Sequence, residues 1–379
     1  MRYSRRQSLA LLAGVSLLSV PKIGFAQGIA DRKFIFVMLR GGMDGLAALI
    51  PDDKKIARLR GKILLPLQAR LNLGNGFRLH PSFAGLKAMY TEGDAAFIHA
   101  AATPYRSRSH FEGQDALETL SHGGLRDGWL NRALVAGGGE GLAVGRAVPL
   151  AMKGPASVRN WSPPIFKTTS DDLLKHLSDL YVDDDLLASS LADARDNQSI
   201  GKDLSTREAR RFTREYTIAL SSIGRLMSKD KGPGIGMVAL DGWDTHDKQK
   251  NKLAKKFLAL DEALTALKVS LGSSWDKSCI IVCSEFGRTV AANGTLGTDH
   301  GTGGLVILLG GAVKGGAVHG DWPGVKKSAR FEGRDLFPAN DIAAILKGVM
   351  RDHLGIDRRA LNASIFPNSG RAFDGLIRT

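Results

Sequence analysis

A helix between two apolar strands is the feature of this sequence that most restricts its fold. Gly236–Leu240 and Cys279–Cys283 are short apolar runs typical of buried strands, and Lys252–Leu271 between them repeats leucine and phenylalanine at helical spacing. Two strands joined by a helix of this length predict a parallel crossover, because parallel strands need a long connection. The sequence therefore predicts an α/β fold built on a parallel sheet.

Other segments extend this pattern. Apolar runs at Phe34–Leu39, Ala95–Ala101 and Leu305–Leu309 predict three further strands. Residues 171–231 are charged, lack strand signals and are helical in pattern, which predicts a helical cap or insertion. We expect residues 27–379 to form a single domain that carries this insertion, since a chain of this length can bury a substantial core.

The first 26 residues are expected to be a twin-arginine signal peptide. Arg2 and the paired Arg5 and Arg6 precede the apolar run Leu9–Val20, and small residues follow up to Ala26. The apolar run is shorter than the roughly 20 residues that span a bilayer, and no later stretch is both apolar and long enough. We expect cleavage after Ala26, export through the twin-arginine translocase, no membrane span afterwards, and a periplasmic or secreted protein.

The charge balance favours anionic partners. The chain has a formal net charge of +14, of which four positive charges lie in the expected leader. Its basic residues are scattered and do not gather with aromatic residues in a recognisable module, so we do not expect nucleic-acid binding. Phosphate esters, sulfate esters and anionic surfaces all fit this charge.

Polar residues gather where the expected strands end, which is the edge at which open parallel sheets form active sites. Five segments have this position, namely Arg40–Gly45, Tyr105–Phe111, Asp241–His246, Ser284–Thr289 and Thr298–Gly301. Aspartate, glutamate and histidine spread over several strand ends are the ligands expected for divalent cations such as Zn²⁺ or Mn²⁺. A hydroxyl at a helix N-terminus is well placed to attack an anionic ester.

The chain also resembles a known family. It does so in the strings GGMDGL, RSHFEGQDALE, GWDTH, SEFGRTVAANGTLGTDHGTGG and VHGDWPG. These strings resemble domain-of-unknown-function family 1501, whose members are bacterial proteins exported by the twin-arginine route. That family is remotely similar to the alkaline phosphatase and sulfatase superfamily. The resemblance implies an alkaline-phosphatase-like central, mostly parallel sheet with helices on both faces and a helical insertion.

The resemblance also implies a set of metal ligands. Glu285 would replace the carboxylate of the superfamily's Asp-His metal pair, while Phe286 stands where that pair has its histidine. Asp244 and His246 resemble the superfamily's other carboxylate and histidine, and His300 resembles its later histidine. With Phe286 in a ligand's place, the site would hold one or two divalent ions, or none. The candidate ions are Zn, Mn, Mg and Ca.

Other ligand assignments remain open. Asp44 would be the carboxylate that follows the first strand, and Asp241 is a second choice for Asp244. An alternative alignment keeps Asp299 and His300 as an intact pair and takes His319 as the later histidine.

The same resemblance suggests the reacting groups. Ser109 would be the nucleophile, with Ser107 as the alternative, and Arg108 or Arg106 together with Arg288 would neutralise the substrate. The sequence thus predicts an exported metal-dependent hydrolase of phosphate or sulfate esters, acting on a small-molecule or polymer ester. The alternative is a non-catalytic exported binding or assembly protein on a degenerate alkaline-phosphatase-like scaffold.

Overall fold

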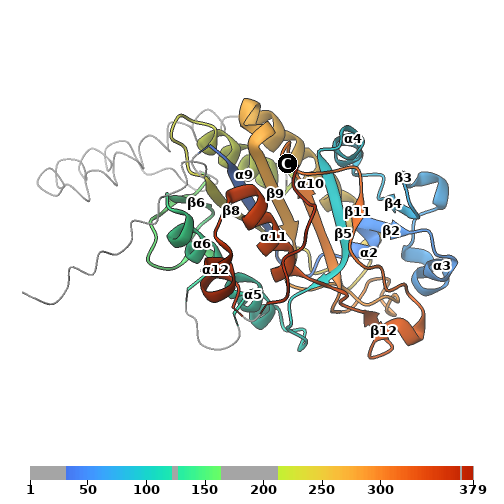
Figure 1. Cartoon of the computed structure of the whole chain (residues 1–379). Coiled ribbons are helices and arrows are strands. Elements are labelled where there is room, and N and C mark those ends of the chain that lie inside the picture. Colours follow the sequence, from blue (N-terminus) through green and yellow to red (C-terminus); the bar gives the residue numbers. More distant parts are fainter. Residues whose placement is uncertain (1–30, 122–126, 164–211, 368, 379) are drawn as a thin grey trace, which may run out of the picture.

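The structure, a computed structural model, describes residues 31–121, 127–163, 212–367 and 369–378 (Figure 1). The strands of its main sheet are β1 (Lys33–Leu39), β5 (Ala95–Ala102), β6 (Gly141–Val144), β7 (Val158–Trp161), β8 (Ile235–Leu240), β9 (Ser278–Cys283), β10 (Gly304–Leu309), β11 (Val318–His319) and β14 (Asn340–Asp341). Eight of these nine strands lie in the order β11-β5-β10-β9-β1-β8-β6-β7, and the ninth, β14, pairs with β5.

The direction of the strands confirms the expected mostly parallel sheet. β1 is parallel to β8 on one side and to β9 on the other, so the predicted crossover is present. β6 and β7 continue the parallel arrangement beyond β8. β10 is reversed, since it pairs antiparallel with both β9 and β5. The start of β10 therefore lies at the edge where β1, β5, β8 and β9 end.

Helices cover both faces of the sheet, as expected (Figure 1). They are α4 (Ala84–Glu92), α5 (His110–Thr119), α6 (Trp129–Gly137), α9 (Phe212–Met227), α10 (Gln249–Leu271) and α11 (Ile342–Leu354). Ile35 and Val37 of β1 belong to one hydrophobic core with α4, α9 and α10. Phe34 and Phe36, which point the other way, belong to a second core with α5, α6 and α11. Alternation along one strand thus builds two separate cores.

A smaller three-stranded sheet lies at one end of the molecule, at the right of Figure 1. Its strands are β2 (Leu49–Pro51), β3 (Leu71–Gly74) and β4 (Phe77–Leu79), and the short helices α2 (Gly45–Ala48) and α3 (Lys54–Arg60) adjoin it. The β-hairpin formed by β12 (Arg330–Phe331) and β13 (Asp335–Leu336) is a second small sheet. The sequence patterns did not indicate either of these sheets.

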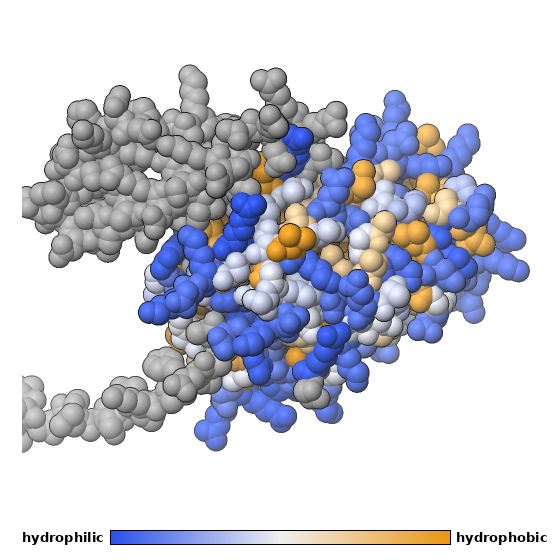
Figure 2. Space-filling view, turned by 90° about the horizontal axis from the view of Figure 1, so that it is seen from above, coloured by the Kyte–Doolittle hydropathy of each residue, from blue (hydrophilic) through white to orange (hydrophobic). Residues whose placement is uncertain are grey.

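Two expected segments lie wholly or partly outside the described residues. These are the leader at 1–26 and the helical insertion, of which residues 171–211 are not described. The described part of the insertion contains α9, which packs along α10. None of the helices in the described ranges has the length and apolar character needed to cross a membrane. In the view of Figure 2, the described surface is mostly hydrophilic, with hydrophobic residues in small separate patches.

Three buried histidines make the stability of the fold depend on pH. Burial lowers the pKa of His80, His99 and His353 to about 4. Each binds a proton more readily in the unfolded chain, near pH 6.5, so the folded state loses stability as the pH falls from about 6.5 to about 4. Each pKa unit corresponds to about 1.4 kcal/mol.

Urea unfolding at pH 7.5, 5.5 and 4.5 measures this effect. We expect the free energy of unfolding to decrease across this window. His353→Gln should show a shallower decrease than the unaltered protein, because one of the three sites no longer titrates. An unfolding free energy that stays constant over this range would contradict the prediction.

Candidate metal centre

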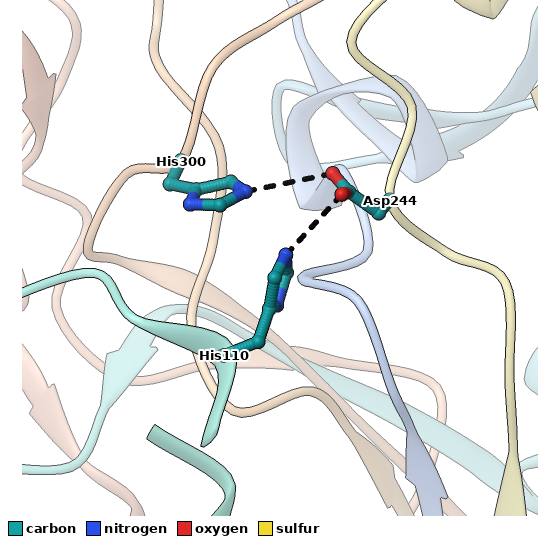
Figure 3. A group of neighbouring side chains, drawn as sticks. All are labelled: His110, Asp244 and His300. Atoms are coloured by element: carbon teal, nitrogen blue, oxygen red, sulfur yellow. Dashed lines mark ion pairs between the residues drawn. The ribbon is translucent and has the colours of Figure 1, made fainter. Parts of the chain in front are cut away.

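Three side chains from distant segments meet at the edge where β5 and β8 end and β10 begins (Figure 3). His110 is the first residue of α5, Asp244 follows β8, and His300 precedes β10. Each offers one ligand atom, and these atoms all lie within 4.8 Å of one another. His300 Nε2 is 3.5 Å from Asp244 Oδ1, and His110 Nε2 is 3.4 Å from Asp244 Oδ2. Each carboxylate oxygen therefore faces one imidazole.

His246 adds a third imidazole to this group. Its Nε2 lies 2.9 Å from Asp244 Oδ1 and 2.9 Å from Nε2 of His300. Two ring nitrogens this close share either a proton or a cation. The side chain of His246 is 44% exposed, so this part of the site is open to solvent.

The second nitrogen of each ring is directed at an oxygen that only accepts hydrogen bonds. These oxygens are Glu285 Oε1, 2.8 Å from Nδ1 of His110; the Arg108 carbonyl, 2.9 Å from Nδ1 of His300; and Asp299 Oδ1, 3.4 Å from Nδ1 of His246. Each Nδ1 is thus the donor, so each Nε2 can accept, and Nε2 of His246 also lies 3.4 Å from Nη1 of Arg288. Metal-binding histidines are oriented in this way. The three Nε2 atoms and the Asp244 carboxylate form a ligand set for a cation.

Two buried atoms at this site have no hydrogen-bond partner among the described residues. They are His110 Nε2 and Glu285 Oε2. Buried polar atoms are seldom left unpaired in native proteins. The unpaired Nε2 faces Asp244, so its position fits a cation held between the two side chains.

Hydrogen bonding and burial set the protonation of the site. The hydrogen bond to Glu285 raises the pKa of His110 above its usual value, whereas burial lowers the pKa of His300. Burial alone would raise the pKa of Asp244, but the hydrogen bond and charge of Arg288 lower it overall. Asp244 is therefore an anion at neutral pH, and a cation bound beside it would compete with the proton of His110.

Two glycines allow the loop after β1 to reach the site. Gly41 has φ +118°, and a Cβ there would lie 2.4 Å from the backbone nitrogen of Asp244. Gly42 has φ +65°, and its Cβ would lie 2.7 Å from the ring of Phe286. The Gly41 N–H donates to Glu285 Oε1 at 2.8 Å, which helps to orient the partner of His110.

The guanidinium groups of Arg288 and Arg108 both have partners within the protein. The Arg288 side chain is fully buried and donates to the carbonyls of Gly41, Gly42 and Thr298 and to Asp244. The Arg108 guanidinium pairs with the two carboxylates of the β12–β13 hairpin, Glu332 and Asp335. Arg288 therefore holds loops together, and Arg108 contributes to the site through the carbonyl that orients His300.

Ser109 occupies the position expected of a nucleophile. It is the N-cap residue of α5, directly before His110, and its side chain makes no capping hydrogen bond. Its backbone N–H donates to Tyr105 Oη at 2.8 Å. The hydroxyl therefore lies at a helix N-terminus that adjoins the histidine cluster.

Asp44 lies outside the cluster. Its Oδ1 accepts from Ala47 N at 3.2 Å and so caps α2. Its Oδ2 accepts from Arg60 and, at 2.7 Å, from Gln249 Nε2. The Asp44 and Arg60 side chains are each 1% exposed, so the carboxylate is part of a buried ion pair. In this arrangement both oxygens already have protein partners.

The structure also locates the other residues that the sequence offered as metal ligands. Asp241 and Asp244 are both exposed, and Asp244 is the carboxylate that reaches the imidazoles. His319 lies on the edge strand β11, where it pairs with Ile98 of β5, and it is not in the cluster of His110, Asp244 and His300. Glu285 and Asp299 lie behind histidine rings rather than in the ligand set.

His110 is the residue that the sequence reasoning missed. It stands in the second polar segment beside Ser109, and that segment was interpreted only through its hydroxyls and arginines. The available signal was a histidine at the start of a helix that follows a strand end. Its pairing with Glu285, 175 residues away, was not visible in the sequence.

Comparison with known proteins gives one family and several solved structures. The model of the family described as protein of unknown function (DUF1501) matches residues 65–363. No curated protein matches the chain.

Three similar solved structures are distant in sequence. The chain is 10% identical to the C-terminal periplasmic domain of EcEptC from Escherichia coli in complex with Zn, covering 74% of this chain and 72% of that chain with a TM-score of 0.37. A TAB5 alkaline phosphatase mutant with Mg bound is 12% identical, with 73% and 90% covered and a TM-score of 0.34. A phosphonate monoester hydrolase of Agrobacterium radiobacter is 9% identical, with 86% and 74% covered and a TM-score of 0.36.

Proposed function

The chain belongs to the DUF1501 family of proteins of unknown function, and we propose that it is an exported metal-dependent hydrolase of phosphate or sulfate esters. This activity is inferred from the candidate site, because the family has no assigned function. The observation that carries this proposal is the convergence of three imidazole Nε2 atoms on Asp244. Nitrogen and carboxylate ligands together suit Zn²⁺ or Mn²⁺. The expected leader would deliver the protein to the periplasm through the twin-arginine translocase.

One divalent ion is the number that the ligand set supports. His110, Asp244 and His300 would hold it, with His246 as a fourth ligand. Such an ion supplies Lewis acidity toward an ester oxygen and lowers the pKa of a bound hydroxyl or water. Glu285 Oε1 is already engaged by Gly41 and His110, and Phe286 stacks on His110 with ring centroids 5.0 Å apart. Phe286 offers no ligand atom where the family resemblance implies a histidine, so the proposal is for a single ion.

Ser109 supplies the nucleophile in this proposal. Its oxygen would bond to the phosphorus or sulfur atom as its proton is released, the bond to the ester oxygen would break, and that oxygen would take up one proton and leave as an alcohol. Water would then hydrolyse the ester formed on Ser109. The free N–H groups at the start of α5 would stabilise the charged oxygens during both steps.

Basic side chains other than Arg108 and Arg288 would balance the substrate charge. Arg334 is 42% exposed, pairs with Asp335 Oδ1 at 3.5 Å and donates to the carbonyl of His300 at 2.7 Å. It therefore places a solvent-accessible cation beside the candidate metal centre. The overall excess of basic residues also favours the approach of anionic esters.

Metal content and hydrolysis of model esters test the proposal together. Protein recovered from the periplasm should contain about one equivalent of a divalent ion and should hydrolyse a phosphate or sulfate ester of p-nitrophenol. Ser109→Ala should lower kcat by at least about 1,000-fold, the order seen when a nucleophile is removed, without changing the metal content. Ser107→Ala is the matched control. Wild-type protein that binds no divalent ion would rule out this function.

A second candidate function has one observation in its favour. The buried guanidinium of Arg288 pairs with Asp244 and lies 3.4 Å from His246 Nε2, so it already supplies positive charge at the carboxylate. That arrangement suits a non-catalytic exported binding or assembly protein. A metal-loaded protein that is inert toward phosphate and sulfate monoesters and diesters would favour this alternative.

A further inference from the structure

A second cleft lies beside the small sheet and shares no residue with the candidate metal centre. Its volume is about 690 Å³, and β2, the start of α3, the β3–β4 turn and Trp322 line it. Ligand sites in proteins commonly have volumes of about 300 to 1,000 Å³. The cleft is thus large enough for a ligand of several rings.

Unpaired cations surround this cleft. Lys54, Lys55 and Arg58 are exposed, and none forms an ion pair with another described residue. Lys54 and Arg58 are four residues apart on α3, where like charges destabilise a helix. An anion bound between them would relieve this repulsion.

The two acids that line the cleft are already engaged. Asp52 accepts from Arg78 Nε at 2.7 Å, and this pairing offsets its charge. Asp53 caps α3 by accepting from the backbone nitrogen of Lys55 at 2.8 Å. The three free cations therefore outweigh the one acid without a cationic partner, and the cleft favours an anion.

Two aromatic rings form the apolar part of the lining. Phe77 of β4 and Trp322 meet edge to face, with centroids 5.5 Å apart and planes at 81°. Phe77 is buried, whereas Trp322 is half-buried and exposes part of its ring. A partly exposed indole beside polar groups offers an apolar face to a flat ligand and a hydrogen-bond donor at its edge. Asn75, in the β3–β4 turn, adds an exposed amide.

Backbone hydrogen bonds hold together the strands and the turn that form the walls of the cleft. β4 pairs with both β2 and β3, and Asp52 N donates to the carbonyl of Gly76 at 2.7 Å. The side chain of Asn72 accepts from Gly74 N at 3.0 Å and fixes the turn. A ligand would meet a largely formed surface, which reduces the cost of ordering on binding.

We propose that this cleft binds an anionic saccharide, a sugar ring that carries carboxylate, sulfate or phosphate groups. The apolar face of the sugar would lie on Trp322, and its anionic groups would meet Lys54, Lys55 and Arg58. The amide of Asn75 would contact its hydroxyls. Three cations beside one aromatic ring suit a short charged saccharide better than a nucleic acid, which is usually bound along an extended basic track with several stacking rings. This site needs no metal and is independent of the proposed hydrolase function.

Calorimetric titration with defined oligomers tests the proposal. The full-length exported protein should bind a galacturonate hexamer or a chondroitin sulfate hexasaccharide, and should not bind the neutral maltohexaose. Two variants should each weaken binding by at least about 10-fold, as expected when central contacts are removed. One is the double variant Lys54→Ala with Arg58→Ala, and the other is the single variant Trp322→Ala. His300→Ala and treatment with EDTA should leave binding unchanged, so failure here is distinguishable from failure of the hydrolase proposal.

A charge-matched control separates a site from general attraction. Arg358→Ala with Arg359→Ala removes two exposed charges from α12 (Arg358–Ala360) and should preserve affinity. The inference is overturned if the unaltered protein binds neither anionic oligomer or if both double variants lose affinity equally. It is also overturned if a single-stranded oligonucleotide of equal charge binds as tightly as the anionic saccharides. The surface variant Lys54→Ala with Arg58→Ala decides the matter if Trp322→Ala does not fold.

Discussion

Replacing His300 by alanine is expected to weaken Zn²⁺ binding by more than about 100-fold. Loss of an outer-shell partner alone weakens metal binding by about 10- to 100-fold, and His300 would be a direct ligand. Its Nε2 lies beside both Asp244 and His246, and the Arg108 carbonyl fixes its ring. Competition with a chromophoric chelator measures the affinity, and mass spectrometry measures the bound metal.

His319→Ala is the matched control for this experiment. His319 lies on β11, outside the cluster, and its loss should leave the affinity unchanged. His110→Ala should weaken binding as well, because its buried Nε2 faces Asp244 without another partner. Equal metal affinity in the unaltered protein and in His300→Ala would show that the ion is held elsewhere.

Replacing Asp44 by alanine is expected to lower the free energy of unfolding by about 3 to 5 kcal/mol. The change leaves the Arg60 guanidinium buried without its carboxylate, and removal of one partner of a buried pair has this cost. It also removes the cap of α2 and the acceptor of Gln249. Urea unfolding measures the loss, and the metal content of the folded protein should remain the same.

Asp52→Ala provides the exposed counterpart of this change. Asp52 pairs with Arg78 near the surface, and its loss should alter the unfolding free energy by no more than about 1 kcal/mol. If Asp44→Ala instead folds with full stability and loses its metal, Asp44 acts as the ligand that the family resemblance implied. The double change Asp44→Leu and Arg60→Leu should recover part of the lost stability, because no buried charge is then left unpaired.

Local patterns in the sequence predicted the framework closely. The strands expected at Phe34–Leu39, Ala95–Ala101, Gly236–Leu240, Cys279–Cys283 and Leu305–Leu309 are present within one residue of the expected bounds at each end. The helix expected at Lys252–Leu271 begins three residues earlier, at Gln249. Runs and periodicities of apolar residues report burial directly, and burial is what defines a strand or a helix face in a core.

Topology was less accessible from the same patterns. Nothing in Leu305–Leu309 distinguishes a reversed strand from a parallel one, because a fully buried strand is apolar in either direction. The reversal of β10 is nevertheless what brings His300, which precedes the strand, to the edge where the other strands end.

The chemistry of single side chains was decided by their partners. Arg108 and Arg288 seemed equivalent as substrate-binding cations in the sequence, yet one pairs with the β12–β13 hairpin and the other is buried against loop carbonyls. Glu285 was expected to bind metal, and in the structure its Oε1 orients His110. The sequence shows the type of an ionisable side chain, but not whether that side chain contacts an ion, an acid or water. Its role therefore depends on contacts with residues that are distant in the sequence.

The helix between two apolar strands was enough by itself to determine a parallel α/β sheet, and the polar strand ends were enough to place Asp244, His246 and His300 near one edge. Only the tertiary structure decided which atoms meet there. Hydrophobic periodicity is a local property that can be recognised in the sequence alone. The convergence of His110, Asp244 and His300 depends on strand order and direction, which arise when segments 56 to 190 residues apart pack together.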